Sequence, residues 1–313
     1  MKIVLLEGLG VSRETLQKHA RRLEAMGHMF TVYERDPDPG VQAERCRDAD
    51  VLMLANMPLS PSALEAAKEL KFINVAFTGV DHIPMAQARQ RGIAVSNASG
   101  YATQAVAELS ISFMIQLLRN VAETEARCRE GGTKDGLVGN LLCGKTVGIV
   151  GAGAIGRKTA ALCKAFGCAV TAFSRSAVRD AAIDRQTSLE ELLGEADIVS
   201  LHCPLTEETK GLIGEAQLRL MKKSAILINT ARGGVVDSTA LARALTEGRI
   251  AGAACDVFET EPPLPADHPL LHCPNTIVTP HIGFASAESM EQRADIVFEN
   301  LYSWLDGTQI HAV

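Results

Sequence analysis

The stretch KTVGIVGAGAIG at residues 145–156 decides the expected fold of this chain. An apolar run at residues 147–150 leads directly into Gly151, Gly153 and Gly156. In a dinucleotide-binding turn, the first glycine allows the tight turn, the second lets the backbone approach a pyrophosphate, and the third lets the helix pack on the strand. A helical pattern and a second apolar strand follow, so the context favours a nucleotide-binding βαβ unit over a chance glycine-rich turn. The anion is expected at the helix N-terminus.

The composition of the whole chain sets broad limits on its class. With 313 residues, 47% of them hydrophobic, the chain is long enough for two domains. The net charge of -6, without a basic stripe, argues against a nucleic-acid partner. No apolar stretch reaches the length of a membrane span and no leader pattern precedes the first strand, so we expect a cytoplasmic protein. The eight cysteines form no CxxC pair, and we expect reduced thiols and no metal site.

Alternating strand and helix patterns occur in two series. The first predicts a parallel, flavodoxin-like sheet, with strands at residues 2–7, 29–34, 51–56, 72–77 and 93–97 and helical stretches such as 13–26 and 62–71. The second starts at the glycine turn and predicts a Rossmann domain, with a helix at 154–166 and strands at 169–173, 197–201, 225–229, 251–255 and 276–278.

Two long helical patterns, at residues 102–128 and 285–305, flank the second series. We infer that the chain crosses into a second domain and returns at its end. The expected fold is α/β with two doubly wound parallel-sheet domains. These are a flavodoxin-like substrate domain, residues 1–100 and 285–313, and a Rossmann cofactor domain, residues 101–284. Binding loops are expected at the carboxyl ends of the strands.

Polar residues of types that often act in catalysis follow three strands of the second series. Arg232 follows the strand at 225–229, Glu261 lies in the loop after 251–255, and His281 follows 276–278. Reduction of a ketone needs a cation for the substrate carboxylate, an acid for the developing alkoxide and a carboxylate that keeps the acid charged. Each residue alone has an ordinary structural explanation, but together the three predict a carbonyl-reducing site.

At these residues the chain resembles the D-isomer-specific 2-hydroxyacid dehydrogenase family, which includes glycerate, hydroxypyruvate, glyoxylate and phosphoglycerate dehydrogenases. The likeness extends over nearly the whole chain. The matching pieces are FTGVDHI (77–83), GYATQAVAE (100–108), GKTVGIVGAGAIG (144–156), LHCPLTEETKGLI (201–213), NTARGGVVDSTAL (229–241), DVFETEP (256–262) and PHIG (280–283). The resemblance implies an NAD(P)-dependent oxidoreductase that moves hydride between the cofactor and a small 2-keto or 2-hydroxy acid.

The resemblance also implies roles for residues of the second series. Arg232 would bind the substrate carboxylate and carbonyl, His281 would donate the proton, and Glu261 would be the partner of His281. Asp256 would contact the nicotinamide amide. The implied cofactor contacts are Gly151, Gly153, Ala154, Ile155, Gly156, Ser174, Arg175, His202, Cys203, Pro204, Thr209, Thr230, Ala231, Asp256 and Gly283.

Substrate contacts are implied in addition at Asn56, Thr78, Gly79, Val80 and Phe284. The amides of residues 78–80 would cradle the carboxylate, and the loop at 55–59 would face the substrate tail. Phosphoglycerate-using relatives have an arginine near this loop, whereas nothing basic appears here in the sequence, so a phosphate would lack a charge-assisted partner. We expect a small uncharged tail, as in glyoxylate or hydroxypyruvate. Phe284 either closes the pocket or only packs at the start of a helix.

The residues after the second Rossmann strand bear on the choice of cofactor. NAD-preferring relatives place an Asp there for the ribose 2′-hydroxyl, but this chain has Ser174, Arg175 and Ser176. An arginine and hydroxyl groups would accept a 2′-phosphate, which a carboxylate would repel. We therefore expect NADP to be preferred over NAD. The alternative is that Arg175 is a solvated cation and that NAD binds.

Other functions on the same fold stay open. A formate dehydrogenase transfers hydride without a proton and has Gln in place of the Glu that partners the histidine, so Glu261 argues for carbonyl reduction. A phosphoglycerate dehydrogenase-like enzyme and a cofactor-sensing corepressor that binds partner proteins remain as alternatives. The helical pattern at 102–128 has more apolar residues than one face needs, among them Val106, Leu109, Phe113, Met114 and Leu117. Because relatives pair through the cofactor domain, we expect a homodimer.

Overall fold

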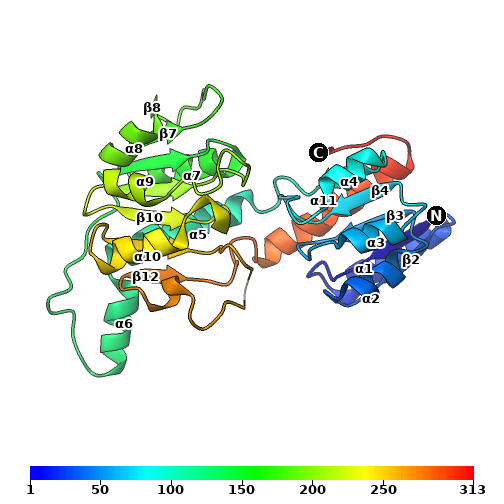
Figure 1. Ribbon diagram of the computed structural model, residues 1–313, viewed down its shortest axis with the longest axis horizontal. Helices are drawn as coiled ribbons and strands as arrows, with labels where there is room; N and C mark the ends of the chain where they lie inside the picture. Colours follow the sequence, from blue (N-terminus) through cyan, green and yellow to red (C-terminus); the bar gives the residue numbers. More distant parts are fainter. Residues whose placement is uncertain (262) are drawn as a thin grey trace. The chain divides into compact units, whose positions relative to one another are not determined.

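The computed structural model describes residues 1–261 and 263–313, which divide into two compact units. Unit 1 consists of Met1–Ala102 and Phe284–Val313, and unit 2 of Thr103–Gly283. Each unit is built on a parallel sheet of its own (Figure 1). Pro262, which belongs to the expected motif at 256–262, lies outside the described residues.

The sheet of unit 1 has the flavodoxin-like order β2-β1-β3-β4-β5, and all its neighbours are parallel. The strands are β1 (Lys2–Leu5), β2 (Met29–Val32), β3 (Val51–Leu54), β4 (Phe72–Val75) and β5 (Ala94–Asn97). Strands β3 and β4 are buried throughout, as expected for apolar runs in a parallel sheet with both faces covered. The helices are α1 (Arg13–Ala25), α2 (Pro39–Cys46), α3 (Pro61–Ala66), α4 (Met85–Gln90) and α11 (Ala287–Leu305).

Helix α11 returns the end of the chain to the sheet of unit 1. The ring of Trp304 stacks on Phe72 of β4 with centroids 4.9 Å apart, and the Asn74 amide donates to the Val297 carbonyl at 2.7 Å. Helix α3 is shorter than the predicted stretch at 62–71. Its last carbonyls, those of Leu64 and Ala67, accept hydrogen bonds from Arg91, which lets the chain leave the helix before β4.

The sheet of unit 2 has the order β12-β11-β10-β9-β6-β7-β8 and is also parallel throughout. The strands are β6 (Thr146–Val150), β7 (Ala169–Phe173), β8 (Arg185–Gln186), β9 (Ile198–Leu201), β10 (Ile226–Asn229), β11 (Gly252–Cys255) and β12 (Thr276–Val278). The short, exposed edge strand β8 was not expected from the sequence. The helices that follow strands here are α7 (Ala154–Ala165), α8 (Leu189–Glu195), α9 (Glu215–Leu220), η1 (Gly233–Val235), α10 (Ser238–Thr246) and η2 (Pro269–His272). The predicted fold class is therefore confirmed.

The prediction of one helix at 102–128 is wrong. The segment forms α5 (Thr103–Leu118) and α6 (Val121–Arg129), which are bent by 62° at the break. Asn120 takes the left-handed conformation, with φ 52° and ψ 40°, and asparagine tolerates this region better than most residues. In the described part of the chain, no single helix is long and apolar enough to cross a membrane; the bent pair α5 and α6 passes that test only when combined.

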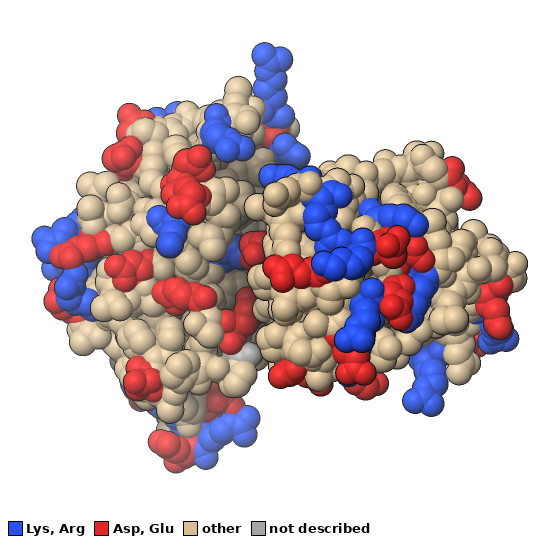
Figure 2. All heavy atoms as spheres, turned by 45° about the vertical axis from the view of Figure 1, so that its right-hand side comes forward, with Lys and Arg blue, Asp and Glu red and all other residues tan. Residues whose placement is uncertain are grey.

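The cysteines and the surface charges are ordinary for such a fold. All eight cysteines are free thiols, and burial raises the pKa of the Cys203 thiol to about 11. On the face drawn in Figure 2, Lys and Arg side chains are interspersed with Asp and Glu side chains.

Candidate active site

The glycine turn after β6 has the geometry of an anion-binding turn. Gly151 has φ +98°, and a Cβ atom there would lie 2.6 Å from the Cys203 nitrogen. A Cβ at Gly156 would overlap the Gly151 carbonyl oxygen. At Gly153, by contrast, a Cβ would have no described heavy atom within 4 Å, and no described side chain caps α7, which begins there with Ala154 and Ile155. The uncapped N–H groups and the open space beside Gly153 fit a pyrophosphate.

The loop after β7 is held by Gln186 of strand β8. The Gln186 amide donates to the carbonyl oxygens of Ser174 and Ser176 at 2.9 and 3.0 Å and accepts from the Val178 nitrogen at 2.9 Å. The Arg175 side chain is exposed, and across residues 1–261 and 263–313 it forms no hydrogen bond or salt bridge. The guanidinium interacts electrostatically with Glu208, but no described hydrogen bond or salt bridge holds it, so a ligand can reach it. The role of Gln186 was missed by the sequence analysis.

Residues His202 to Thr209 form the loop after β9. The His202 ring shares a 2.9 Å hydrogen bond with the Ser200 hydroxyl, while its other ring nitrogen, Nδ1, is buried without a partner among the described residues. Burial lowers the pKa of His202 to about 4, so this imidazole is neutral near pH 7. The Thr209 hydroxyl donates to the exposed Pro204 at its carbonyl oxygen, 2.6 Å away, and therefore closes its own loop.

Asn229 fixes the loop that carries Arg232. Its amide oxygen accepts from the Ala231 nitrogen and its amide nitrogen donates to the Arg232 carbonyl, both at 3.1 Å. Directly after Arg232, a Cβ atom at Gly233 would overlap the carbonyl carbon of Phe258. The Thr230 hydroxyl contacts Ser110 of α5 at 2.9 Å. Asn229 was not singled out from the sequence, although a buried Asn that ends an apolar strand could have indicated such a role.

His281 and Glu261 form the expected pair. The ring nitrogen Nδ1 of His281 lies 2.8 Å from Oε2 and 3.0 Å from Oε1 of Glu261. An ionised carboxylate only accepts hydrogen bonds, so Nδ1 carries the proton in this contact. The His281 side chain is 12% exposed, and that of Glu261 is 54% exposed.

Asp256 builds the loop around His281. It is 1% exposed, and burial raises the pKa of its carboxyl group. One carboxylate oxygen accepts from the Thr279 hydroxyl at 2.6 Å and the Ile282 nitrogen at 2.8 Å, and the other accepts from the Gly283 nitrogen at 2.7 Å. The expected contact of Asp256 with a nicotinamide amide stays a prediction. Its observed hydrogen bonds show that Asp256 stabilises the conformation of this loop.

The candidate substrate residues of unit 1 lie at the carboxyl end of its sheet. Across the described chain, the backbone N–H groups of Thr78, Gly79 and Val80, just after β4, donate no hydrogen bond. Such a run of open amides suits a carboxylate. The half-buried Phe284 packs edge-on against Phe77, with ring centroids 5.1 Å apart.

The expectation that nothing basic lies near the loop at 55–59 is wrong. Arg35, which follows β2, donates from Nη1 to the Asn56 amide oxygen at 2.9 Å and to a Glu7 carboxylate oxygen at 2.6 Å. The arginine is distant in sequence but adjacent in the sheet. It belongs to the site residues that sequence reasoning missed.

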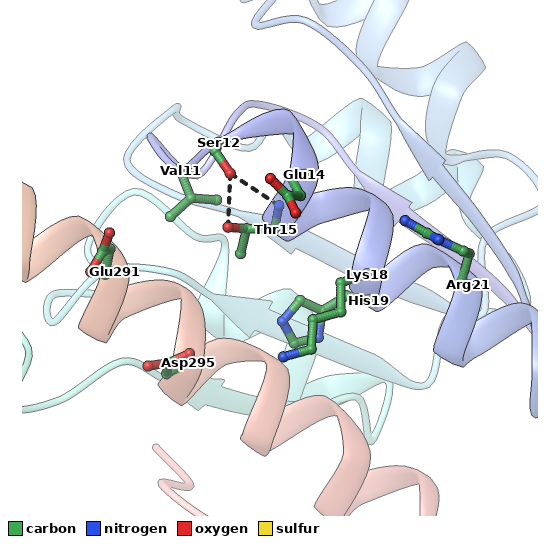
Figure 3. A pocket seen from close by; sticks show the side chains of 9 residues that line it. All are labelled: Val11, Ser12, Glu14, Thr15, Lys18, His19, Arg21, Glu291 and Asp295. Carbon is green, nitrogen blue, oxygen red and sulfur yellow. Dashed lines mark hydrogen bonds between the residues drawn. The ribbon is translucent and has the colours of Figure 1, made fainter.

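A cavity of about 660 Å³ lies between α1 and α11 (Figure 3). It is lined by Val11, Ser12, Glu14, Thr15, Lys18, His19, Arg21, Glu291 and Asp295. The hydroxyl groups of Ser12 and Thr15 hydrogen-bond to each other at 2.9 Å, as part of the cap of α1. These are helix-surface residues, and the cavity includes none of the expected site residues among the described ones. Within the described chain, no group of three or more His, Cys, Asp or Glu could hold a metal ion.

Comparison with known proteins agrees with this geometry. Residues 111–283 match the family model for the D-isomer specific 2-hydroxyacid dehydrogenase, NAD binding domain. The chain is 40% identical over 285 residues to a glyoxylate reductase from Korarchaeum cryptofilum, with 88% of this chain and 85% of the relative covered. It is 32% identical over 326 residues to a hydroxypyruvate reductase from Blautia hydrogenotrophica, with 100% and 99% covered.

Among solved structures, an acyclic imino acid reductase in complex with NADPH and D-Arg superposes with a TM-score of 0.92 at 27% identity. The superposition covers 100% of both chains. The match to the family model spans more than half of the chain, and the curated relatives match it over most of its length. The chain therefore belongs to the D-isomer-specific 2-hydroxyacid dehydrogenase family.

Proposed function

We propose that this nicotinamide-dependent oxidoreductase is a 2-keto acid reductase that acts on a small substrate such as glyoxylate or hydroxypyruvate. The observation that carries the proposal is the 2.8 Å contact between His281 Nδ1 and Glu261, which orients the ring and gives its protonated form a carboxylate partner. The relatives named glyoxylate reductase and hydroxypyruvate reductase support the same substrate class.

In the proposed reaction, the Arg232 guanidinium binds the substrate carboxylate and polarises the carbonyl group. A nicotinamide cofactor, when bound, would supply the hydride for the carbonyl carbon. His281 then donates the proton from Nε2 to the carbonyl oxygen, which becomes the hydroxyl group of the product. Glu261 stabilises the imidazolium before the transfer and fixes the ring orientation.

The pairing of His281 with a carboxylate separates this proposal from formate oxidation. Formate oxidation releases carbon dioxide and needs no proton donor at the substrate. A charged acid held by Glu261 would have no task in that reaction, whereas carbonyl reduction requires it.

A substrate panel tests the proposed function. Oxidation of NADPH and of NADH should be followed with glyoxylate, hydroxypyruvate, pyruvate and 3-phosphohydroxypyruvate, and reduction of NAD⁺ with formate. We expect keto-acid-dependent oxidation and no activity with formate. Tight cofactor binding without turnover of any keto acid would contradict the proposal and support the corepressor alternative.

NADP is the proposed cofactor. Arg175 is exposed and available after β7, and Ser174 brings no negative charge that would repel a 2′-phosphate. A charge-assisted hydrogen bond of about 1.5–3 kcal/mol corresponds to roughly tenfold to hundredfold in preference. Arg175→Ala should therefore weaken NADPH use alone, Ser174→Asp should shift preference toward NADH, and Arg179→Ala, an exposed arginine of the same loop, serves as the control. If the wild-type enzyme prefers NADH, or Arg175→Ala weakens both cofactors equally, the NADP assignment is wrong.

A homodimer formed through unit 2 is also proposed. Helix α6 has no buried residue among the described ones, and it lies apart from the sheet of unit 2 (Figure 1). In the loop that follows, Val138 is 85% exposed and Leu141 is 69% exposed. These apolar side chains would be covered by a second copy. Light scattering that gives the mass of one chain at micromolar concentration would contradict the dimer.

A further inference from the structure

Three residues meet at the point of the unit 1 sheet where ligands of such folds bind. The chain places β2 on one side of β1 and β3 on the other, so the direction of strand addition reverses between β1 and β3. In open α/β sheets, ligands bind outside the carboxyl ends of the strands at such a reversal. Glu7 follows β1, Arg35 follows β2 and Asn56 follows β3, so all three lie at this edge.

Glu7 holds the backbone on both sides of Asn56. Its side chain is 4% exposed, and Oε1 accepts from the backbone nitrogens of Ala55 at 2.8 Å and Met57 at 2.7 Å. The other oxygen, Oε2, accepts from Arg35 at 2.6 Å. Because a buried carboxylate is costly unless it is paired and hydrogen-bonded, this network fixes the loop firmly.

Arg35 determines which way the Asn56 amide points. Its Nη1 has two hydrogens, and the partners within reach are Glu7 Oε2 and Asn56 Oδ1, the latter at 2.9 Å. A guanidinium has donors only, so the amide atom that faces it must be the oxygen. The NH₂ group of Asn56 therefore faces away from Arg35. It donates to no group in the described chain, and Asn56 is only partly buried.

The charge at this point is balanced. Arg35 is half exposed, but its positive charge is paired with the buried Glu7 carboxylate. A phosphate dianion would therefore find little net positive charge, whereas a neutral hydroxyl group needs only a donor. The open amides after β4 belong to the neighbouring strand, since β3 and β4 pair directly. Adjacent strands are about 4.8 Å apart, so a carboxylate bound at these amides would lie beside the loop that carries Asn56.

We propose that Glu7 and Arg35 are positioning residues that present the Asn56 NH₂ group to a hydroxyl on the substrate carbon next to the keto group. The enzyme then prefers a hydroxyl-bearing 2-keto acid such as hydroxypyruvate over glyoxylate, pyruvate or a phosphorylated keto acid. This inference rests on the proposed reductase function and adds the recognition of the substrate tail to it.

The first test removes the donor. The ratio of kcat/KM for hydroxypyruvate to kcat/KM for glyoxylate should be measured in the wild-type enzyme and in Asn56→Leu, which keeps the branched shape of the side chain without its polar atoms. The loss of one hydrogen bond should lower this ratio about tenfold and favour pyruvate, whose methyl group suits a leucine. Arg47→Met, at an exposed position where the described chain gives the arginine side chain no hydrogen bond or salt bridge, is the control and should leave the ratio unchanged.

The second test breaks the ion pair between Glu7 and Arg35 but keeps the hydrogen bonds that Glu7 accepts from the loop. In Glu7→Gln the amide oxygen can still accept from Ala55 and Met57, but the NH₂ group cannot accept from Arg35. The freed positive charge should raise kcat/KM for 3-phosphohydroxypyruvate by about tenfold, while kcat/KM for hydroxypyruvate falls. If Glu7 had only a structural role, its replacement would not raise kcat/KM for any substrate. Glu69→Gln, at an exposed position, is the control, and thermal unfolding reports whether each variant folds.

The outcomes separate this inference from the proposed function. If the wild-type enzyme reduces glyoxylate or pyruvate better than hydroxypyruvate, the inference fails and the reductase function stands. The inference also fails if Asn56→Leu, and Glu7→Gln where it folds, change kcat/KM for all keto acids by one common factor. If the wild-type enzyme reduces no keto acid, both proposals are wrong.

Discussion

Replacement of Gly153 by alanine should weaken cofactor binding and leave the fold intact. Gly153 has φ -73° and ψ -166°, a conformation open to any residue. A Cβ atom there would have no described heavy atom within 4 Å. The alanine also reduces the entropy of the unfolded chain, so the free energy of unfolding should stay equal or rise by about 0.4–1 kcal/mol.

The alanine should be unfavourable only when the cofactor binds. If the pyrophosphate approaches the backbone at Gly153, the added methyl group occupies the space that the phosphate oxygens need. The phosphate would then lose one or two hydrogen bonds from the first turn of α7. Each charge-assisted bond contributes about 1.5–3 kcal/mol, so the Kd should rise roughly tenfold to hundredfold for each bond that is lost.

Two measurements check this prediction, namely calorimetric titration with NADPH and with NADH, and thermal unfolding of the free protein. Gly194→Ala in α8, where a Cβ would also meet open space, is the matched control and should bind like the wild-type protein. Gly156→Ala should instead destabilise the free protein, because its Cβ would overlap the Gly151 carbonyl. A Tm several degrees lower in Gly153→Ala, or an unchanged Kd for both cofactors, would refute the reasoning.

Three further predictions concern side chains of unit 2. His281→Ala should lower kcat by about 10²–10⁴-fold in steady-state kinetics, with His272→Ala as the control. Near-normal turnover of His281→Ala would remove the assignment. Arg232→Lys should raise KM for the keto acid because lysine lacks the bidentate fork; an equal loss of cofactor affinity would show a structural role instead. Burial lowers the pKa of His202 from 6.5 to about 4, so in this range the unfolded chain binds the proton first, and the free energy of unfolding should decrease as the pH falls from 6.5 to 4. The contribution is about 3 kcal/mol. Urea unfolding should show a shallower pH dependence of the free energy of unfolding in His202→Asn than in the wild-type protein. Parallel pH curves for the two proteins would show that His202 is not the cause.

The sequence predicted the elements whose physical cause is local. The apolar run of β6 ends in glycines that the structure requires, since Gly151 has a positive φ and Gly156 packs on the turn. The strands β7 and β12 have the predicted bounds. Both sheets are parallel because the helix after each strand carries the chain back to the end of the sheet where that strand began, so the next strand runs in the same direction. Family membership followed from motifs at these strand ends, and the comparisons confirm it.

Features that depend on tertiary contacts were not predictable in the same way. Asn120 breaks the helix by a left-handed conformation that the sequence pattern, without Gly or Pro, does not reveal. Arg35 precedes Asn56 by 21 positions, and only the order β2-β1-β3 brings the two side chains together. The contacts of Asp256 with residues 279–283 likewise depend on the pairing of β11 with β12.

The backbone at His281 favours catalysis over a purely binding function for this site. His281 has φ +58°, in the left-handed region, which costs a non-glycine residue about 1–3 kcal/mol. Asp256 offsets this cost, because its carbonyl accepts from the His281 nitrogen at 2.8 Å and its carboxylate from the next two backbone nitrogens. A corepressor needs shape and charge here, but not a histidine ring that is oriented by a carboxylate. Proton transfer requires that orientation, since the donor must lie within hydrogen-bond distance of the carbonyl oxygen. We propose that the strained backbone and the Glu261 contact serve one end, which is to orient the His281 ring for proton transfer.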